Sequence, residues 1–280
     1  MASNSSNQDE YILSRGLQDN MRLNLQHYLW NDKGYLLHPS IPIKEGLRIA
    51  EIGVGTGIWS LETARIVPKS AQIDGFDIDI SQCPPRDLLP KNVTFSVHNC
   101  LTPFPHELTG TYDVVHIRLF ILFVQENDPG PLLRNFLRLL KPGGYISWSE
   151  YEYKSLEVIS TSIPEVEDSI TPLLHFIGSI GETKPSWTAT HWPSDLPQTY
   201  KEIGLTNIEV DRRPFSRELL PFYLDACLAA CEEISYKALD PLGGGKGERA
   251  RSLVKKCLEN RQKSHLQLNR LTVLGRKPEK

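Results

Sequence analysis

A short glycine-rich segment, Glu51 to Gly57 (EIGVGTG), has the residue types and spacing best suited to holding a small ligand. It lies between an apolar run and a helical pattern, which places it in the turn between a strand and a helix. Gly53 and Gly55 permit a tight turn and a close approach of the backbone to a bound molecule. Their spacing is G-x-G-x-G, whereas dinucleotide-binding turns have G-x-G-x-x-G. The loop therefore argues against NAD.

Two acidic residues accompany this loop. Glu51 comes directly before the first glycine, and Asp77 ends the next apolar run. S-adenosylmethionine carries an ammonium group, a sulfonium and a ribose diol, and carboxylates accept hydrogen bonds from hydroxyls and favour nearby positive charge. The two acids therefore favour S-adenosylmethionine as the cofactor, with Asp77 at the ribose hydroxyls.

Strand and helix patterns alternate around the loop and must position it. Strands are expected at LRIAEIG, AQIDGFDID, NVTFSVHN, YDVVHIRLF and YISWSEYEY, and helices at 57–67 and in PLLRNFLRLLKPGG. Parallel neighbours in a sheet need crossover connections, so this order predicts a mostly parallel α/β sheet with helices on both faces. Ligands of such sheets bind at the carboxyl ends of the strands. We therefore expect the site at that edge.

The flanking segments contain further elements. An amphipathic helix is expected over 11–30, two more helices over 221–239 and 249–268, and strands at LTNIEVDRRPF and LTVLG. The expected organisation is a disordered tail (1–10), an N-terminal helical lid (11–45), a cofactor-binding core (46–153), a substrate-side helical insertion (154–200) and the remainder of the fold with a helical cap (201–280).

Composition excludes several functional classes. The chain of 280 residues is 40% hydrophobic and 23% charged, as in ordinary globular proteins. A net charge of −3 gives no broad positive field, which argues against a nucleic-acid partner. The five cysteines are scattered and lack the spacing of metal motifs, so we expect free thiols and no metal. No apolar run approaches the length that spans a bilayer, and a cytoplasmic protein without membrane contact is expected.

The motifs EIGVGTGIW, GFDI, NCLTPFP, YDVVHIRL and LLKPGGYISW resemble the successive motifs of class I S-adenosylmethionine-dependent methyltransferases, from about Leu47 to Trp148. The flanks RLNLQHYLW and LGRKP are similar to fungal methyltransferases of secondary metabolism. The resemblance implies a Rossmann-like seven-stranded sheet, S-adenosylmethionine as cofactor, and methyl transfer to an oxygen or nitrogen of a small organic acceptor that is aromatic or peptide-like.

The resemblance also implies cofactor contacts at matching positions. The three loop glycines would face the methionine portion, Asp77 the ribose and Ile78 the adenine, while Asn99 stands where the family usually has an aspartate. Arg118 either pairs with the methionine carboxylate or is an exposed arginine. The N-terminal helix either forms a lid or docks on the domain. The expected cofactor-binding residues are Glu51, Gly53, Val54, Gly55, Gly57, Asp77, Ile78, Asn99, Cys100, Leu101, Ile117 and Arg118.

Methyl transfer is an in-line displacement, so the main task of the protein is to align the acceptor with the methyl group. A hydroxyl acceptor benefits from a base, whereas a neutral amine reacts without one. His116 is the candidate catalytic base, although strand alternation could turn it into the sheet packing. Candidate substrate-binding residues, for which core packing is the alternative, are Trp148, Tyr151, Trp187 and Trp192.

Two alternative functions use the same cofactor loop. A protein of this fold can bind S-adenosylmethionine and catalyse a cyclisation or rearrangement without methylation, and the product mass would reveal this. A methyltransferase-like regulatory protein would act through protein partners without small-molecule turnover. The sequence specifies no oligomeric state.

Overall fold

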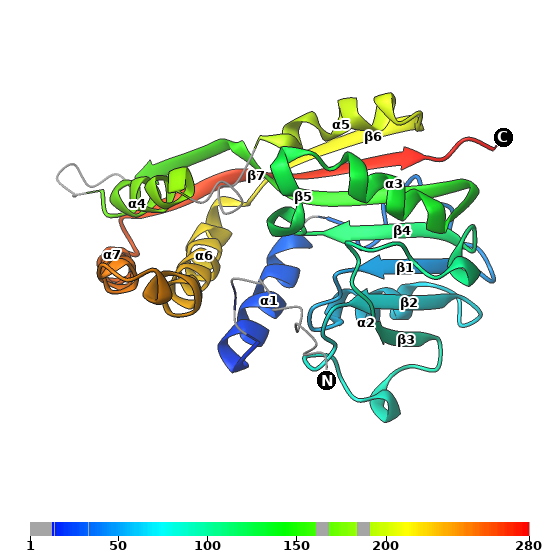
Figure 1. The fold of residues 1–280 in the computed structure, drawn as a ribbon, viewed down its shortest axis with the longest axis horizontal. Helices are drawn as coiled ribbons and strands as arrows, with labels where there is room; N and C mark the ends of the chain where they lie inside the picture. The colour runs from blue at the N-terminus through cyan, green and yellow to red at the C-terminus, as the bar shows by residue number, and fades with distance from the viewer. Residues whose placement is uncertain (1–12, 14, 33, 161–167, 184–190, 280) are drawn as a thin grey trace, which may run out of the picture.

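The computed structural model describes residues 13, 15–32, 34–160, 168–183 and 191–279. These residues contain one seven-stranded sheet in the order β3-β2-β1-β4-β5-β7-β6 (Figure 1). Strands β1 to β5 run parallel to one another, and β7 is antiparallel to both β5 and β6. This arrangement confirms the predicted Rossmann-like class I sheet. The strands are β1 (Arg48–Ile52), β2 (Gln72–Asp77), β3 (Val93–Val97), β4 (Tyr112–Arg118), β5 (Leu140–Ser160), β6 (Thr206–Pro214) and β7 (Ser264–Arg276).

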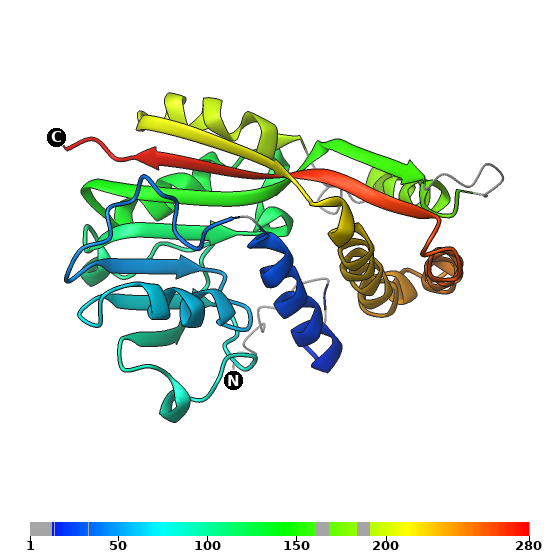
Figure 2. The same ribbon diagram turned by 180° about the vertical axis from the view of Figure 1, so that it is seen from behind.

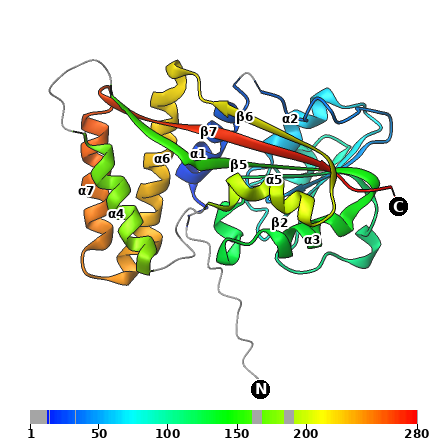
Figure 3. The same ribbon diagram turned by 90° about the horizontal axis from the view of Figure 1, so that it is seen from above.

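Helices cover both faces of the sheet, as the alternating pattern predicts. Helix α2 packs against β2 and β3, whereas α3 and α5 lie on the opposite face (Figure 3). In α3, apolar residues recur at helical spacing and bury one stripe against the sheet, with Leu133 and Phe136 fully buried. The helices are α1 (Leu17–Trp30), α2 (Ile58–Ile66), α3 (Gly130–Leu139), α4 (Ile170–Thr183), α5 (Trp192–Glu202), α6 (Leu220–Ile234) and α7 (Lys246–Glu259).

Strands β5 and β7 form a long antiparallel ribbon that continues past the rest of the sheet. Their pairing runs from Tyr145 and Arg276 to Ser160 and Ser264, with an irregularity between Glu152 and Glu157. Helices α4, α6 and α7 gather around the far end of this ribbon (Figure 3). We call these three helices with the ribbon end the cap.

The structure differs from two sequence expectations in this region. Residues 154–160 continue β5, and α5 packs on the sheet, so only part of 154–200 lies outside the sheet layers. The predicted helix over 249–268 was wrong beyond Glu259, because 264–268 belong to β7. There Leu266 and Leu268 alternate with Gln267, which is the two-residue period of a strand. The predicted tail 1–10 lies outside the described residues.

Helix α1 stands between the cofactor half of the sheet and the cap (Figures 1 and 2). Leu29 and Trp30 near its end belong to the apolar cluster of the cap, together with Tyr223 and Leu224 of α6. Helix α1 thus packs against the cap on one side and faces the sheet edge on the other. Within the described ranges, no helix has the length and apolar character needed to cross a membrane.

Candidate cofactor site

A cavity lies at the carboxyl edge of β1, β2 and β4, beneath α1. Its walls come from the loop between β1 and α2, from the residues after β2 and β4, and from one side of α1. The lining residues are Arg15, Leu23, Gln26, His27, Glu51, Gly53, Val54, Gly55, Thr56, Ile58, Trp59, Asp77, Ile78, Gln82, Arg118, Leu119, Phe120 and Phe123.

The three loop glycines have different roles. All have positive φ angles, 73° at Gly53, 54° at Gly55 and 75° at Gly57, where residues with a Cβ are strained. A Cβ at Gly57 would lie 2.5 Å from the Phe95 ring, and one at Gly53 would lie 2.9 Å from Phe120. At Gly55 the nearest atom is a Leu23 methyl at 3.5 Å. Gly57 therefore serves packing, whereas Gly55 keeps the backbone open to the cavity.

Asp77 ties the loop to the end of β2. Its Oδ2 accepts a hydrogen bond from the Gly55 N–H at 2.9 Å, and its Oδ1 accepts one from the Asp79 N–H at 3.3 Å. Burial raises the pKa of this carboxyl, and the backbone hydrogen bonds oppose that rise. Each carboxylate oxygen accepts more than one hydrogen bond. Asp77 can therefore hold the loop and still accept hydrogen bonds from a ribose diol.

Glu51 and Arg118 place opposite charges on the floor of the cavity. Glu51 is buried and Arg118 is half-buried, and the Ser60 hydroxyl donates to the Glu51 carboxylate. Burial raises the pKa of Glu51 to about 7, against the lowering effects of Ser60 and Arg118. Burial lowers the pKa of Arg118 to about 10, against the effect of Glu51. A cationic ligand would favour the ionised form of Glu51.

His27 of α1 contacts the same arginine. Arg118 donates to His27 Nδ1 at 2.9 Å, and the Asn31 side chain lies 3.1 Å from Nε2. Because an arginine only donates, Nδ1 must accept and the imidazole is neutral. Burial and Arg118 lower the pKa of His27 to about 3. Both ring nitrogens are engaged, so His27 fastens α1 to the sheet edge.

A strained turn follows β4 and supplies Leu119, which the family resemblance placed at the mouth of the site, and two cavity residues that the sequence analysis missed, Phe120 and Phe123. Leu119 has a φ of 54°, and its N–H donates to Ser149. The Phe120 N–H donates to Glu150 Oε1 at 2.6 Å, and the Trp148 indole donates to the same oxygen at 2.9 Å. Burial raises the pKa of Glu150 to about 8. The position after β4 was the available signal for Phe120 and Phe123, since strand ends line such sites.

The structure brings together part of the predicted cofactor set. Asn99 accepts a hydrogen bond from the Leu101 N–H in its own loop, Cys100 is buried in the core, and Ile117 packs in the sheet interior. Five of the predicted cofactor residues do not belong to the lining of the cavity: Gly57, Asn99, Cys100, Leu101 and Ile117. The predicted cofactor residues in the lining are Glu51, Gly53, Val54, Gly55, Asp77, Ile78 and Arg118.

His116, the candidate base, lies behind the cavity wall. Its ring stacks on Trp59 with the centroids 3.8 Å apart and an angle of 5° between the planes. Burial lowers the pKa of His116 well below its usual value. Trp59 lines the cavity and His116 does not. The position differs from the expectation because strand alternation directs this side chain toward α2, the alternative that the sequence left open.

The aromatic residues predicted to bind the substrate lie in different environments. Trp148 is fully buried in the core and packs against Trp192, with ring centroids 5.2 Å apart. Tyr151 lies in the apolar cluster of the cap, 5.2 Å from the Trp30 ring. Trp187 lies outside the described residues. Core packing thus describes Trp148 and Trp192. The described residues contain no group of His, Cys, Asp and Glu side chains placed to hold a metal ion.

Comparisons with known proteins agree with this geometry. A family described as a methyltransferase domain matches residues 23–205. Methyltransferase grgD of a Penicillium species is 34% identical over 55% of this chain, and the matched part is 57% of that protein. N-methyltransferase tcpN of Claviceps purpurea is 35% identical over 69% of this chain and 72% of its own length.

A solved structure shares the fold. It is phosphoethanolamine N-methyltransferase 2 of Haemonchus contortus, in complex with phosphomonomethylethanolamine and S-adenosylhomocysteine. The TM-score is 0.50 at 18% identity, over 92% of this chain and 57% of that one. The chain belongs to the methyltransferase-domain family, whose members use S-adenosylmethionine as cofactor.

Proposed function

We propose that this protein transfers the methyl group of S-adenosylmethionine to a nitrogen of a small organic acceptor of the secondary-metabolite kind. The cavity supports this proposal, because an open glycine loop, a strand-end carboxylate and a half-buried arginine meet beneath one helix. The name of the Claviceps relative supports nitrogen as the acceptor atom. A cytoplasmic location remains a prediction.

The residues of the cavity match the parts of the cofactor by their chemistry. Asp77 would accept hydrogen bonds from the ribose hydroxyls, and Arg118 would pair with the methionine carboxylate. Glu51 would favour the positive charge of the ammonium and sulfonium groups. When bound, the cofactor supplies an electrophilic methyl group on sulfur. The protein then has to align the acceptor and exclude water.

The choice of nitrogen over oxygen also rests on the available bases. A hydroxyl needs a base close to it, whereas a neutral amine attacks without one. Among the described residues that line the cavity, His27 is the single histidine, and both of its ring nitrogens are engaged. The carboxyl groups of Glu51 and Asp77, which also line the cavity, are assigned to the cofactor, so an acceptor that needs no base fits this arrangement.

The test begins with calorimetric titration of the protein with S-adenosylmethionine and, separately, with NAD. We expect binding of the first ligand alone. Aromatic amines, phenols and cyclic dipeptides would then be incubated with protein and cofactor, and a mass gain of one methyl group on an amine would support the proposal. Methylation confined to phenols would contradict the choice of nitrogen. A product of unchanged mass would favour the cyclisation alternative, and cofactor binding with stable protein partners but no turnover would favour the regulatory one.

A further inference from the structure

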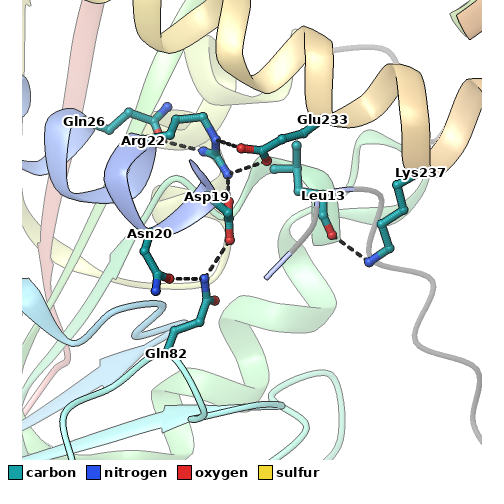
Figure 4. Close-up of polar contacts among 8 residues, drawn as sticks. All are labelled: Leu13, Asp19, Asn20, Arg22, Gln26, Gln82, Glu233 and Lys237. Atoms are coloured by element: carbon teal, nitrogen blue, oxygen red, sulfur yellow. Dashed lines mark hydrogen bonds and ion pairs between the residues drawn. The ribbon is translucent and has the colours of Figure 1, made fainter. Parts of the chain in front are cut away.

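A buried polar cluster outside the cavity joins α1 to α6 of the cap (Figure 4). Arg22 is its centre, and its side chain donates to Asp19, to Gln26 and to Glu233 of α6. Arg22 is 4% exposed and Glu233 is 6% exposed. Removing one partner of a buried ion pair is costly, so these side chains hold one another in fixed positions.

The shape of the guanidinium connects the two ends of this cluster. Arg22 Nε and Nη2 each lie 3.3 Å from a different oxygen of Glu233. Because the guanidinium is planar and rigid, this fork fixes the direction of the remaining nitrogen. That nitrogen, Nη1, donates to Gln26 Oε1 at 2.8 Å. Glu233 therefore orients Gln26 from a different part of the fold.

Gln26 lines the cavity, and Arg22 determines which end of its amide is available there. The amide oxygen accepts from Arg22, so the NH₂ group is the end left for a ligand. The Gln26 side chain also interacts with the hydroxyl of the buried Tyr151. Arg118 lines the same cavity, so the Gln26 amide and the Arg118 guanidinium both offer donors of the kind that an anionic oxygen requires.

We propose that Glu233 is a positioning residue of the cofactor cavity, which acts through Arg22 to hold the Gln26 amide as a donor to the carboxylate of S-adenosylmethionine. This inference rests on the cofactor position given under the proposed function. It makes the cap a determinant of cofactor affinity, although Glu233 itself does not line the cavity.

The experiment compares two ligands by calorimetry. S-adenosylmethionine has the carboxylate, whereas 5′-methylthioadenosine has the adenosine half without the amino-acid half. For Glu233→Gln we expect about tenfold weaker binding of S-adenosylmethionine, the loss of one charge-assisted hydrogen bond. Binding of 5′-methylthioadenosine should stay unchanged. Asp225→Asn is the matched control, because Asp225 also lies on α6 and pairs with Arg261, away from the cavity.

A double-mutant cycle tests the route through Gln26. Glu233→Gln should have no further effect on S-adenosylmethionine affinity in a Gln26→Ala background, because the group that it positions is gone. Gln26→Glu gives an independent test should Glu233→Gln not fold. A carboxylate at this position can still accept from Arg22 but cannot donate, so the same selective loss is expected.

Three results would overturn the inference: unchanged S-adenosylmethionine affinity in folded Glu233→Gln, equal weakening of both ligands, or additive effects in the cycle. Each presupposes that the wild-type protein binds S-adenosylmethionine. Failure of the wild type to bind would instead overturn the proposed function.

Discussion

The cofactor half of the molecule and the cap are built from contacts of different range. In the cofactor half, β1, β2 and β4 and the loops after them come from one continuous stretch of sequence, and the loop residues touch the cavity directly. In the cap, β5 pairs with β7 across the whole second half of the chain, and Glu233 reaches the cavity only through Arg22. One region thus forms most of the cavity wall, and the other holds α1 over it.

The largest expected effect lies in the cofactor half. Gly57→Ala should lower the free energy of unfolding by about 3 kcal/mol for two reasons. The backbone has a positive φ at this residue, and an added Cβ would lie 2.5 Å from the Phe95 ring. Gly46 is the matched control, since it has a φ of 67° and no atom within 4 Å of an added Cβ. Gly46→Ala should cost only about 1 kcal/mol. Denaturant unfolding measures both, and equal losses would show that the contact with Phe95 is not important.

Asp77→Ala tests the proposed role of the cofactor half in ligand binding, whereas Gly57→Ala tests its stability. The substitution leaves the Gly55 N–H without its acceptor and removes the proposed ribose contact, so S-adenosylmethionine affinity should fall by roughly 30-fold to 100-fold. Asp77→Asn keeps an acceptor oxygen and should lose less. Calorimetry on both variants tests this order. Wild-type affinity in Asp77→Ala would place the ribose elsewhere.

Glu51 is expected to have a smaller effect, which is to make the affinity for S-adenosylmethionine depend on pH. Its pKa of about 7 in the free protein means that the carboxyl is partly protonated at neutral pH. A cationic ligand favours the ionised form, so binding must release this proton below pH 7, and affinity should rise from pH 6 to pH 8. Glu51→Gln should reduce that slope. Calorimetry in buffers of different ionisation enthalpy counts the released protons. An identical slope and proton count in both proteins would refute the role.

The smallest effect is expected at His116. His116→Phe keeps an aromatic ring against Trp59 and removes the imidazole, so kcat should stay within about twofold of the wild type. Turnover with an identified acceptor is the measurement, and a thermal unfolding curve confirms that the variant is folded. A drop in kcat with unchanged cofactor affinity would restore His116 as the base.

The difference between short-range contacts in the cofactor half and long-range contacts in the cap also determines what the sequence could predict. The glycine loop, Asp77 and Arg118 were found because local pattern and strand order place them at one edge. Gln26 lies in the N-terminal helix, which was expected only as a lid or a docked element. Glu233 was not found, because its contact with Arg22 joins residues far apart in the chain. Strand alternation left His116 with two orientations, and the decision depended on Trp59 from another element. Long-range pairing also determined that 264–268 is a strand.

The position of β7 between β5 and β6 has a consequence for synthesis on the ribosome. Strand β6 pairs with β7 within the described sheet, and β7 follows it in the chain after α6 and α7. The four strands β1 to β4 can pair as soon as they emerge, whereas β6 must wait for a later segment. Completion of the sheet edge and assembly of the cap are therefore expected to be one late event, during which β6 depends on chaperones or on its own polar residues to stay unpaired.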